Sequence, residues 1–371
     1  MTKQSASPTV AFALGGLAGN NAHGGGFLQA ALDQRVEPLM ISCTSGQLRW
    51  VKHYLAARER GASLRSIMAA EVADLHKTGN LNADVAMLGL FGKAKVFRPA
   101  YEHLLPDLMR NASEAYAKLL SSQGNVLLAD HLMSMLPGRS LVPEFEPSYF
   151  DGLRDAFNTA PMGIAFNAYN PQEGVEYVYV NPKARELLQV STKPEAAAKP
   201  DAGGDASDTS HRPYRFYRDI DTAAVRDALW LYQYGFYDKD SQFVDGAYFR
   251  DMMLAELVVA DLIFSVRPIN HKWIGELPRS YQAVEDLKTE VGFNGAYAAE
   301  RDQITLINKL LAKNYLDPTQ AGRFHHIDLV ELEVSTQRGY FDYMLESQDV
   351  FDASEKMAIA KFAKLREAGK L

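Results

Sequence analysis

Ser45 and Asp245 are the two residues of this sequence that best combine into a catalytic pair. Ser45 lies in the run CTSGQ at residues 43–47, between an apolar run at residues 36–42 and apolar residues at helical spacing over residues 48–58. A serine on such a strand-to-helix turn gains reactivity because the turn exposes its hydroxyl, while the helix N-terminus offers N–H groups and a positive dipole. The sequence therefore predicts a serine nucleophile.

The elbow motif around Ser45 is incomplete. Nucleophile elbows read G-x-S-x-G, and here Cys43 and Gln47 occupy the two glycine positions. Gly46 directly follows the serine and is a further candidate for the site. By itself the pattern also fits an ordinary turn with a capping serine. Cys43 is a rival thiol nucleophile, although a small buried residue that ends a strand explains it equally well.

A glycine-rich loop precedes the elbow. An apolar strand is predicted at residues 10–14, followed by GGLAGNN at residues 15–21 and a helical pattern that reaches Leu32. Such a loop can present backbone N–H groups to an anion, as an oxyanion hole requires. Its glycines do not keep the G-x-G-x-x-G spacing of a dinucleotide site. His23, in the helix after the loop, is a further candidate, for which we expect a packing or capping role.

In this order of strand, glycine loop, helix, strand and serine elbow, the sequence resembles the patatin-like phospholipase family. The family loop reads roughly LGGGGARGAAHxGxL, and residues 14–28 read LGGLAGNNAHGGGFL. The family's Asp-Gly-Gly motif, which supplies the second member of a Ser-Asp dyad, is matched by DGA at residues 245–247. The resemblance implies a three-layer α/β/α fold with a largely parallel central sheet, and neither a cofactor nor a metal. It also implies an oxyanion hole built from the loop residues Gly15, Gly16, Leu17, Ala18, Gly19 and Asn20.

The loop departs from the family pattern at four positions. Leu17 and Ala18 replace glycines, Asn20 stands where the family has a basic residue, and Asn21 replaces the next glycine. An oxyanion hole mainly needs backbone N–H groups, which these residues retain, and an asparagine amide could serve as a further donor. The missing positive charge leaves the preference for a phospholipid head group open.

Two further mechanisms and one non-catalytic role remain as alternatives. A triad of the α/β-hydrolase type would use Asp245 or Asp261 as the acid and His325 or His326 as the base. An acyltransferase would use the same acyl-Ser45 intermediate with an alcohol or thiol as acceptor. A patatin-like protein that only binds a lipid or a protein partner would explain the degenerate motifs. We expect an esterase, lipase or phospholipase that acts on acyl esters or lipids and contacts a lipid or membrane surface peripherally.

Length and composition agree with this expectation. A chain of 371 residues with 47% hydrophobic content can form one large α/β domain, which we predict over residues 1–371. The net charge of −7 argues against nucleic acid as a partner. Lone Cys43 excludes an internal disulfide, and no apolar run reaches the roughly 18 residues of a membrane span. Residues 10–14 are needed as a core strand, so we expect no cleaved signal peptide and predict a cytoplasmic protein.

The rest of the chain supplies the surrounding elements. A Leu- and Met-rich helical insertion at about residues 99–137 could form a lid and line an acyl-chain pocket, or pack on the sheet. The segment at about 191–213 is rich in Ala, Pro, Gly, Asp and Ser, which predicts a mobile loop. Residues 301–313 of a predicted helix place Ile304, Ile307, Leu310 and Leu311 on one face, which could pack on the core or form a homodimer interface. The predicted strands lie at 162–169, 175–180, 262–269 and 327–334, and the predicted helices at 295–313 and 353–368.

Overall fold

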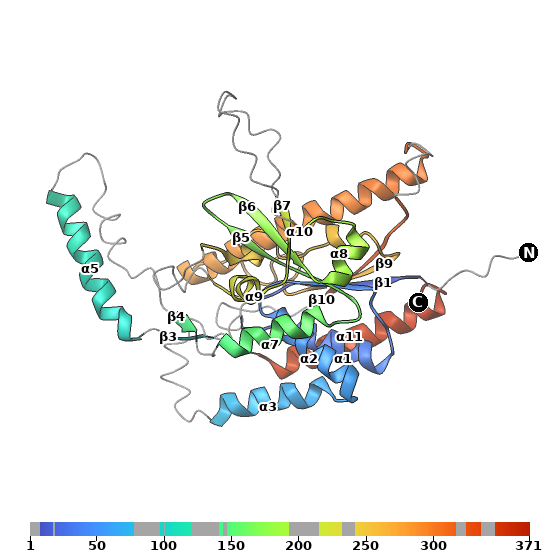
Figure 1. The fold of residues 1–371 in the computed structure, drawn as a ribbon, viewed down its shortest axis with the longest axis horizontal. Helices are drawn as coiled ribbons and strands as arrows, with labels where there is room; N and C mark the ends of the chain where they lie inside the picture. Colours follow the sequence, from blue (N-terminus) through green and yellow to red (C-terminus); the bar gives the residue numbers. More distant parts are fainter. Residues whose placement is uncertain are drawn as a thin grey trace, which may run out of the picture.

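The computed structural model is organised around one mixed sheet with helices on both faces (Figure 1). It describes residues 8–17, 19–77, 97–99, 101–120, 141–143, 147–192, 215–231, 242–316, 324–334 and 346–371. The sheet has eight strands in the order β10-β9-β1-β2-β5-β6-β7, and β8 pairs with β5. Neighbours from β10 to β5 are parallel, as are β6 and β7, whereas β5 is antiparallel to both β6 and β8. The fold is therefore α/β with a largely parallel sheet, as predicted.

The strands of this sheet are short and mostly apolar. They are β1 (Val10–Leu14), β2 (Met40–Cys43), β5 (Gly163–Asn170), β6 (Val175–Val180), β7 (Arg215–Asp219), β8 (Val244–Asp245), β9 (Leu262–Arg267) and β10 (Asp328–Glu333). A separate pair is formed by β3 (Phe97–Pro99) and β4 (Leu141–Pro143). Every residue of β1, β2 and β9 is buried. Continuous apolar runs of this kind are typical of parallel strands that are covered on both faces.

Two hydrophobic cores separate the sheet from its two helical layers. Alternate strand residues such as Phe12 and Ile41 pack on one face, and their neighbours Ala11 and Met40 pack on the other. The first core includes residues of α1 (Ala22–Asp33), α2 (Gln47–Arg60), α3 (Leu64–Lys77), α7 (Pro147–Asn158), α9 (Thr222–Ala228) and α11 (Gln348–Glu367). The second includes residues of α8 (Pro182–Leu188), the 3-10 helix η3 (Ala255–Leu257) and α10 (Tyr281–Ala312). These cores define a three-layer arrangement.

The predicted strands are confirmed with small shifts. The second strand begins at Met40, four residues later than predicted, and the hairpin between β5 and β6 forms as expected. The C-terminal helix begins earlier than predicted, at Gln348. The largest difference is in α10, which starts at Tyr281, because the Ser280 side chain caps the helix by accepting a hydrogen bond from the Ala283 N–H.

The predicted helical insertion is described only in part. Its first half forms α5 (Tyr101–Leu120), and Figure 1 shows this helix standing apart from the helices that cover the sheet. Four large apolar side chains of α5, those of Leu105, Leu108, Met109 and Tyr116, are exposed. Residues 121–137 of the insertion and nearly all of the predicted loop at 191–213 lie outside the described residues.

Candidate active site

The glycine loop and the serine elbow meet because β1 and β2 are neighbouring parallel strands. Leu14, the last residue of β1, is paired with Cys43, the last residue of β2. The carboxyl ends of parallel strands lie at the same edge of a sheet, which is where ligands bind in open α/β folds. The loop after β1 and Ser45 after β2 therefore leave the sheet side by side.

Asp245 reaches the same place through a different strand. β2 pairs with residues 163–165 of β5, and β8 pairs with Ala168 and Tyr169 farther along the same strand. β6 occupies the other edge of β5, so β8 continues the line of β2 beyond its end. Asp245 consequently lies just past the carboxyl end of β2, where the chain turns through Ser45.

The backbone at Ser45 has the strained conformation of a sharp turn. Its φ angle is +52°, which is rare for a residue with a side chain, and α2 begins two residues later. Gln47 replaces an elbow glycine without a clash because its buried side chain lies against Gly24 of α1, where a Cβ would come within 2.0 Å of Gln47 Oε1. The elbow geometry therefore survives the loss of the motif glycine.

Gly16 lies directly against the elbow. A Cβ at Gly16 would come within 2.4 Å of both the Ser45 Cβ and the Thr44 carbonyl oxygen, so no other residue fits without a shift. The Gly16 N–H itself donates to Thr44 Oγ1 at 2.7 Å. The loop is thus in contact with the candidate nucleophile, although this N–H is already engaged.

The hydrogen bonds of the loop narrow the predicted oxyanion hole. The N–H groups of Gly15, Leu17 and Asn20 donate to the Val266 carbonyl, Asn21 Oδ1 and the Leu17 carbonyl. Ala18 lies outside the described residues. Within the described part of the chain, the N–H groups of Gly19 and Gly46 donate no hydrogen bond. These two groups remain as backbone donors in the loop and at the elbow.

The Asp245 carboxyl group is buried and poised to exchange a proton near neutral pH. Only 1% of the residue is exposed, and Oδ1 accepts a hydrogen bond from the Ala247 N–H at 2.9 Å. Burial raises the pKa of Asp245 to about 7, against the opposing effects of the Ser45 hydroxyl and the Ala247 N–H. Oδ2 has no hydrogen-bond partner of ordinary geometry within the described residues. This oxygen is free to accept a proton.

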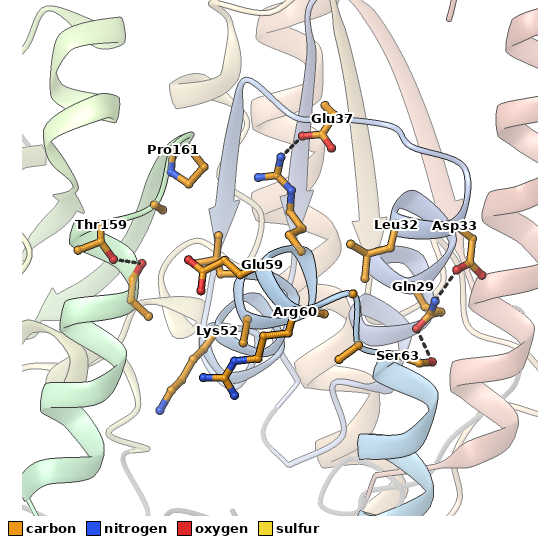
Figure 2. Close-up of a pocket in the computed structure, with 18 of the residues that line it drawn as sticks. Gln29, Leu32, Asp33, Glu37, Lys52, Glu59, Arg60, Ser63, Thr159 and Pro161 are labelled. Carbon is orange, nitrogen blue, oxygen red and sulfur yellow. Dashed lines mark hydrogen bonds and ion pairs between the residues drawn. The ribbon is translucent and has the colours of Figure 1, made fainter.

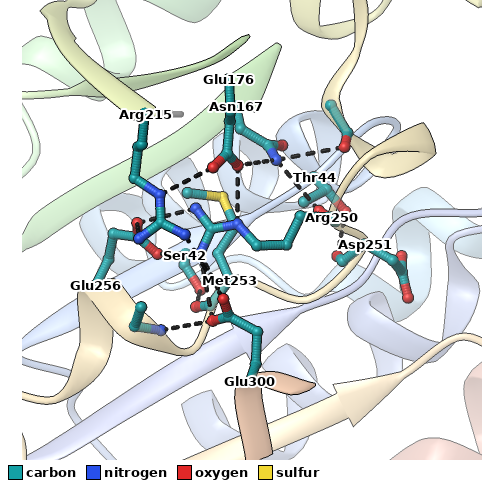
Figure 3. A network of polar contacts seen from close by, with 12 residues as sticks. Ser42, Thr44, Asn167, Glu176, Arg215, Arg250, Asp251, Met253, Glu256 and Glu300 are labelled. Carbon is teal, nitrogen blue, oxygen red and sulfur yellow. Dashed lines mark hydrogen bonds and ion pairs between the residues drawn. The ribbon is translucent and has the colours of Figure 1, made fainter. Parts of the chain in front are cut away.

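A buried cluster of charged residues holds the segment that follows Asp245 (Figure 3). The Arg250 guanidinium donates two hydrogen bonds to Glu256, at 2.8 and 2.9 Å, and one to Glu176 at 2.8 Å. The Arg250 N–H donates to the Gly246 carbonyl at 2.8 Å. Burial would raise the pKa of Glu256, but Arg250 lowers it overall, so the pair stays ionised. The cluster fixes the turn that presents Asp245.

The uncharged side chain of Asn167 joins this cluster to β5 through two hydrogen bonds. Asn167 of β5 donates from Nδ2 to Glu176 at 2.7 Å and to the Arg250 carbonyl at 3.1 Å. A Cβ at Gly246 would come within 2.2 Å of the Asn167 side chain. The glycine after Asp245 is therefore required by packing against β5.

The alternative triad is inconsistent with the structure. Asp261 directly precedes β9, and His325 and His326 precede β10, so all three lie at the amino ends of parallel strands. Ser45 follows the carboxyl end of β2, at the opposite edge. His325 Nε2 is 3.0 Å from the Ala260 carbonyl oxygen, and His326 Nε2 is 3.3 Å from Asp328 Oδ1. These histidines have local structural roles.

Cys43 and His23 are close to Ser45 in the chain or in space, but their surroundings indicate supporting roles. Cys43 is 1% exposed within the main core, and burial strongly raises the pKa of its thiol, which disfavours a thiolate nucleophile. His23 is fully buried, with Nε2 2.7 Å from the Gly15 carbonyl oxygen and 3.0 Å from Gln47 Nε2. It therefore links the glycine loop to the first turn of α2.

A pocket of about 820 Å³ lies elsewhere, at the far end of α2 (Figure 2). Its walls include Lys52, Arg60, Ser63 and Thr159, and Arg58 within it is paired with Glu37. Ser45 precedes the first residue of α2, whereas these residues surround its last turn. The pocket is therefore separate from the candidate active site.

Several supporting residues could not be found from the sequence. Asp251 and Glu346 reach the site from distant parts of the chain: the Asp251 carbonyl accepts a hydrogen bond from Thr44, and Glu346 accepts hydrogen bonds from the Asn21 N–H and the Trp50 indole. Of the residues that support the site, Thr44 alone lies next to Ser45 in the sequence. No group of three or more metal-ligating side chains occurs in the described residues.

Comparison with known proteins gives one partial match. A family model for the PAS domain matches residues 153–227, which run from α7 to α9. The strands of this stretch, β5, β6 and β7, belong to the central sheet, and the match includes neither Ser45 nor Asp245. No curated protein matches the chain. Among the described helices, none combines the length and the apolar character that crossing a bilayer would require.

Proposed function

We propose that this protein is a patatin-like serine hydrolase that cleaves carboxylic esters of acyl chains. The observation that carries the proposal is the position of the buried Asp245 carboxyl group beside Ser45, whose hydroxyl offsets part of the rise in the carboxyl pKa that burial causes and whose backbone turns with a φ of +52°. Ser45 follows the carboxyl end of β2, and β8, which ends at Asp245, approaches that end from the opposite direction, beside a glycine loop that contacts Ser45.

In the proposed reaction the Ser45 hydroxyl attacks the ester carbonyl while its proton passes to Asp245 Oδ2. The N–H groups of Gly19 and Gly46 stabilise the negative oxygen of the tetrahedral intermediate. The carbon–oxygen bond to the leaving group then breaks, and the leaving alkoxide takes the proton from Asp245. Water repeats the sequence on the acyl-Ser45 intermediate and releases the fatty acid.

Ester turnover tests this proposal. We expect the purified protein to hydrolyse p-nitrophenyl esters, Ser45→Ala to abolish turnover, and Asp245→Asn to nearly abolish it. His326→Ala is a matched control, because His326 lies at the other edge of the sheet, and should keep the wild-type rate. Full activity in Ser45→Ala would refute the assignment.

A second candidate is a protein of the same fold that binds a lipid or a protein partner without catalysis. The engagement of the Gly15, Gly16 and Leu17 N–H groups favours it, because few donors remain for an oxyanion. The absence of turnover in a folded sample, together with saturable binding to lipid vesicles, would select this candidate. An acyltransferase would instead show faster ester cleavage when an alcohol or thiol acceptor is added.

A further inference from the structure

The hydroxyl of Thr44 lies where the three parts of the candidate site come together, and Figure 3 shows Thr44 beside Asp251. Thr44 Oγ1 accepts a hydrogen bond from the Gly16 N–H at 2.7 Å and donates one to the Asp251 carbonyl at 2.8 Å. The residue is fully buried. One side chain therefore joins the elbow, the glycine loop and the segment that continues from Asp245.

The contact with the glycine loop leaves little freedom of position. The Gly16 Cα faces the Ser45 Cβ so closely that an added Cβ would come within 2.4 Å of it. Gly15 is equally confined, since a Cβ there would come within 2.5 Å of Met252 Sδ. A small movement of the loop would therefore change the position of its backbone relative to Ser45.

Removing the hydroxyl would leave two buried backbone groups without a partner. Among the residues that the structure describes, the Gly16 N–H and the Asp251 carbonyl make no other hydrogen bond, and an unpaired buried polar group is costly enough to drive a local shift. Such a shift would separate the loop from the elbow and the Asp245 segment from both.

Ser42, two residues earlier on β2, offers a matched comparison. Its hydroxyl donates to the Met253 carbonyl at 2.7 Å, and it is as buried as Thr44. It therefore ties β2 to the same downstream segment. This hydrogen bond does not involve the glycine loop, and its loss should not alter the distance between the loop and Ser45.

We propose that Thr44 is a positioning residue that sets the glycine loop and the Asp245 segment against the Ser45 nucleophile. The inference rests on the proposed hydrolase function. Thr44 acts on the reaction only through the groups that it holds, and its hydroxyl takes no proton from the substrate.

The test measures the rate at which a fluorophosphonate probe labels Ser45 in four proteins. In this reaction the Ser45 oxygen bonds to phosphorus, fluoride leaves, and the serine proton passes to Asp245. We expect Thr44→Val, which keeps the shape but loses the hydroxyl, to lower the maximal labelling rate by about 100-fold, as misplacement of a reacting group by about 1 Å does. Thr44→Ser should restore most of the rate, and Ser42→Ala should label like the wild type.

The outcomes separate this inference from the proposed function. Wild-type labelling with equal rates in Thr44→Val would overturn the inference alone, as would an equal loss in Ser42→Ala. Failure of the folded wild type to label would overturn the proposed function and the inference with it. If Thr44→Val does not fold, hydrogen exchange in the wild type decides: the Gly16 amide must be protected, and an amide that exchanges freely overturns the inference.

Discussion

Replacing Asp245 by asparagine should stabilise the protein increasingly as the pH rises. Burial raises the pKa of this carboxyl group from 3.8 to about 7, so the folded state binds its proton more tightly than the unfolded state does. The stabilisation from the protonated form is fully present below the unfolded pKa and is lost as the pH rises through about 7. Asparagine is neutral at every pH and avoids this loss.

The magnitude follows from the two pKa values. A difference between 3.8 and about 7 corresponds to about 4 kcal/mol in the free energy of unfolding, at about 1.4 kcal/mol per pKa unit. Roughly 2 to 3 kcal/mol of it should develop between about pH 5 and about pH 8.5. Burial raises the pKa of Asp251 and the charge of Asp245 adds to this rise, so removing the Asp245 charge acts in the same direction.

Urea unfolding of Asp245→Asn and the wild type at these two pH values measures the effect. The difference in the free energy of unfolding between the two proteins should favour the variant more at high pH. Comparing this difference at the two pH values removes any packing effect of the substitution that does not depend on pH. Asp261→Asn is the control, because hydrogen bonds from Thr9 lower the pKa of Asp261, so this carboxylate is ionised in the folded and the unfolded state above about pH 5 and its replacement should change the stability equally at both pH values. A difference between Asp245→Asn and the wild type that stays constant across this range would refute the reasoning.

Three further predictions concern the same site. The hydrolysis rate should rise with pH through an apparent pKa of about 7 as Asp245 loses its proton, and a rate that is flat from about pH 5 to about pH 9 would contradict this role. Cys43→Ala should keep fluorophosphonate labelling and lose only about 1 kcal/mol of stability, because the thiol is a small buried group; complete loss of labelling in a folded variant would point to the cysteine. Glu256→Gln should destabilise the protein by roughly 3 to 5 kcal/mol, because it removes one partner of a buried ion pair with Arg250. Denaturant unfolding checks it against Glu186→Gln, whose ion pair with Lys183 is exposed, and an equal loss in both would contradict the prediction.

The order of strands and helices around the site was predictable from local sequence. The apolar runs of β1 and β2 and the helical spacing after each run are properties of neighbouring residues. The two strands and the helices that follow them form in the predicted order. The start of β2 was less accurate, because Val36 is buried without joining the strand. Burial alone does not reveal where strand pairing begins.

The contacts that complete the site were not predictable in this way. Arg250 and Glu176 are separated by 74 residues in the chain and meet because β6, which carries Glu176, and β8, which precedes Arg250, both pair with β5. The use of the Gly16 N–H by Thr44 likewise depends on the pairing of β1 with β2. The sequence predicted the oxyanion loop, but only the folded structure shows which of its N–H groups are already hydrogen-bonded.

The most direct test of the account is to incubate the purified protein with a fluorophosphonate and to map the modified peptide by mass spectrometry. We expect a single adduct on Ser45 that is absent from Ser45→Ala and strongly slowed in Asp245→Asn. An adduct on a different residue, or no adduct in a folded sample, would contradict the assignment of Ser45 as an activated nucleophile.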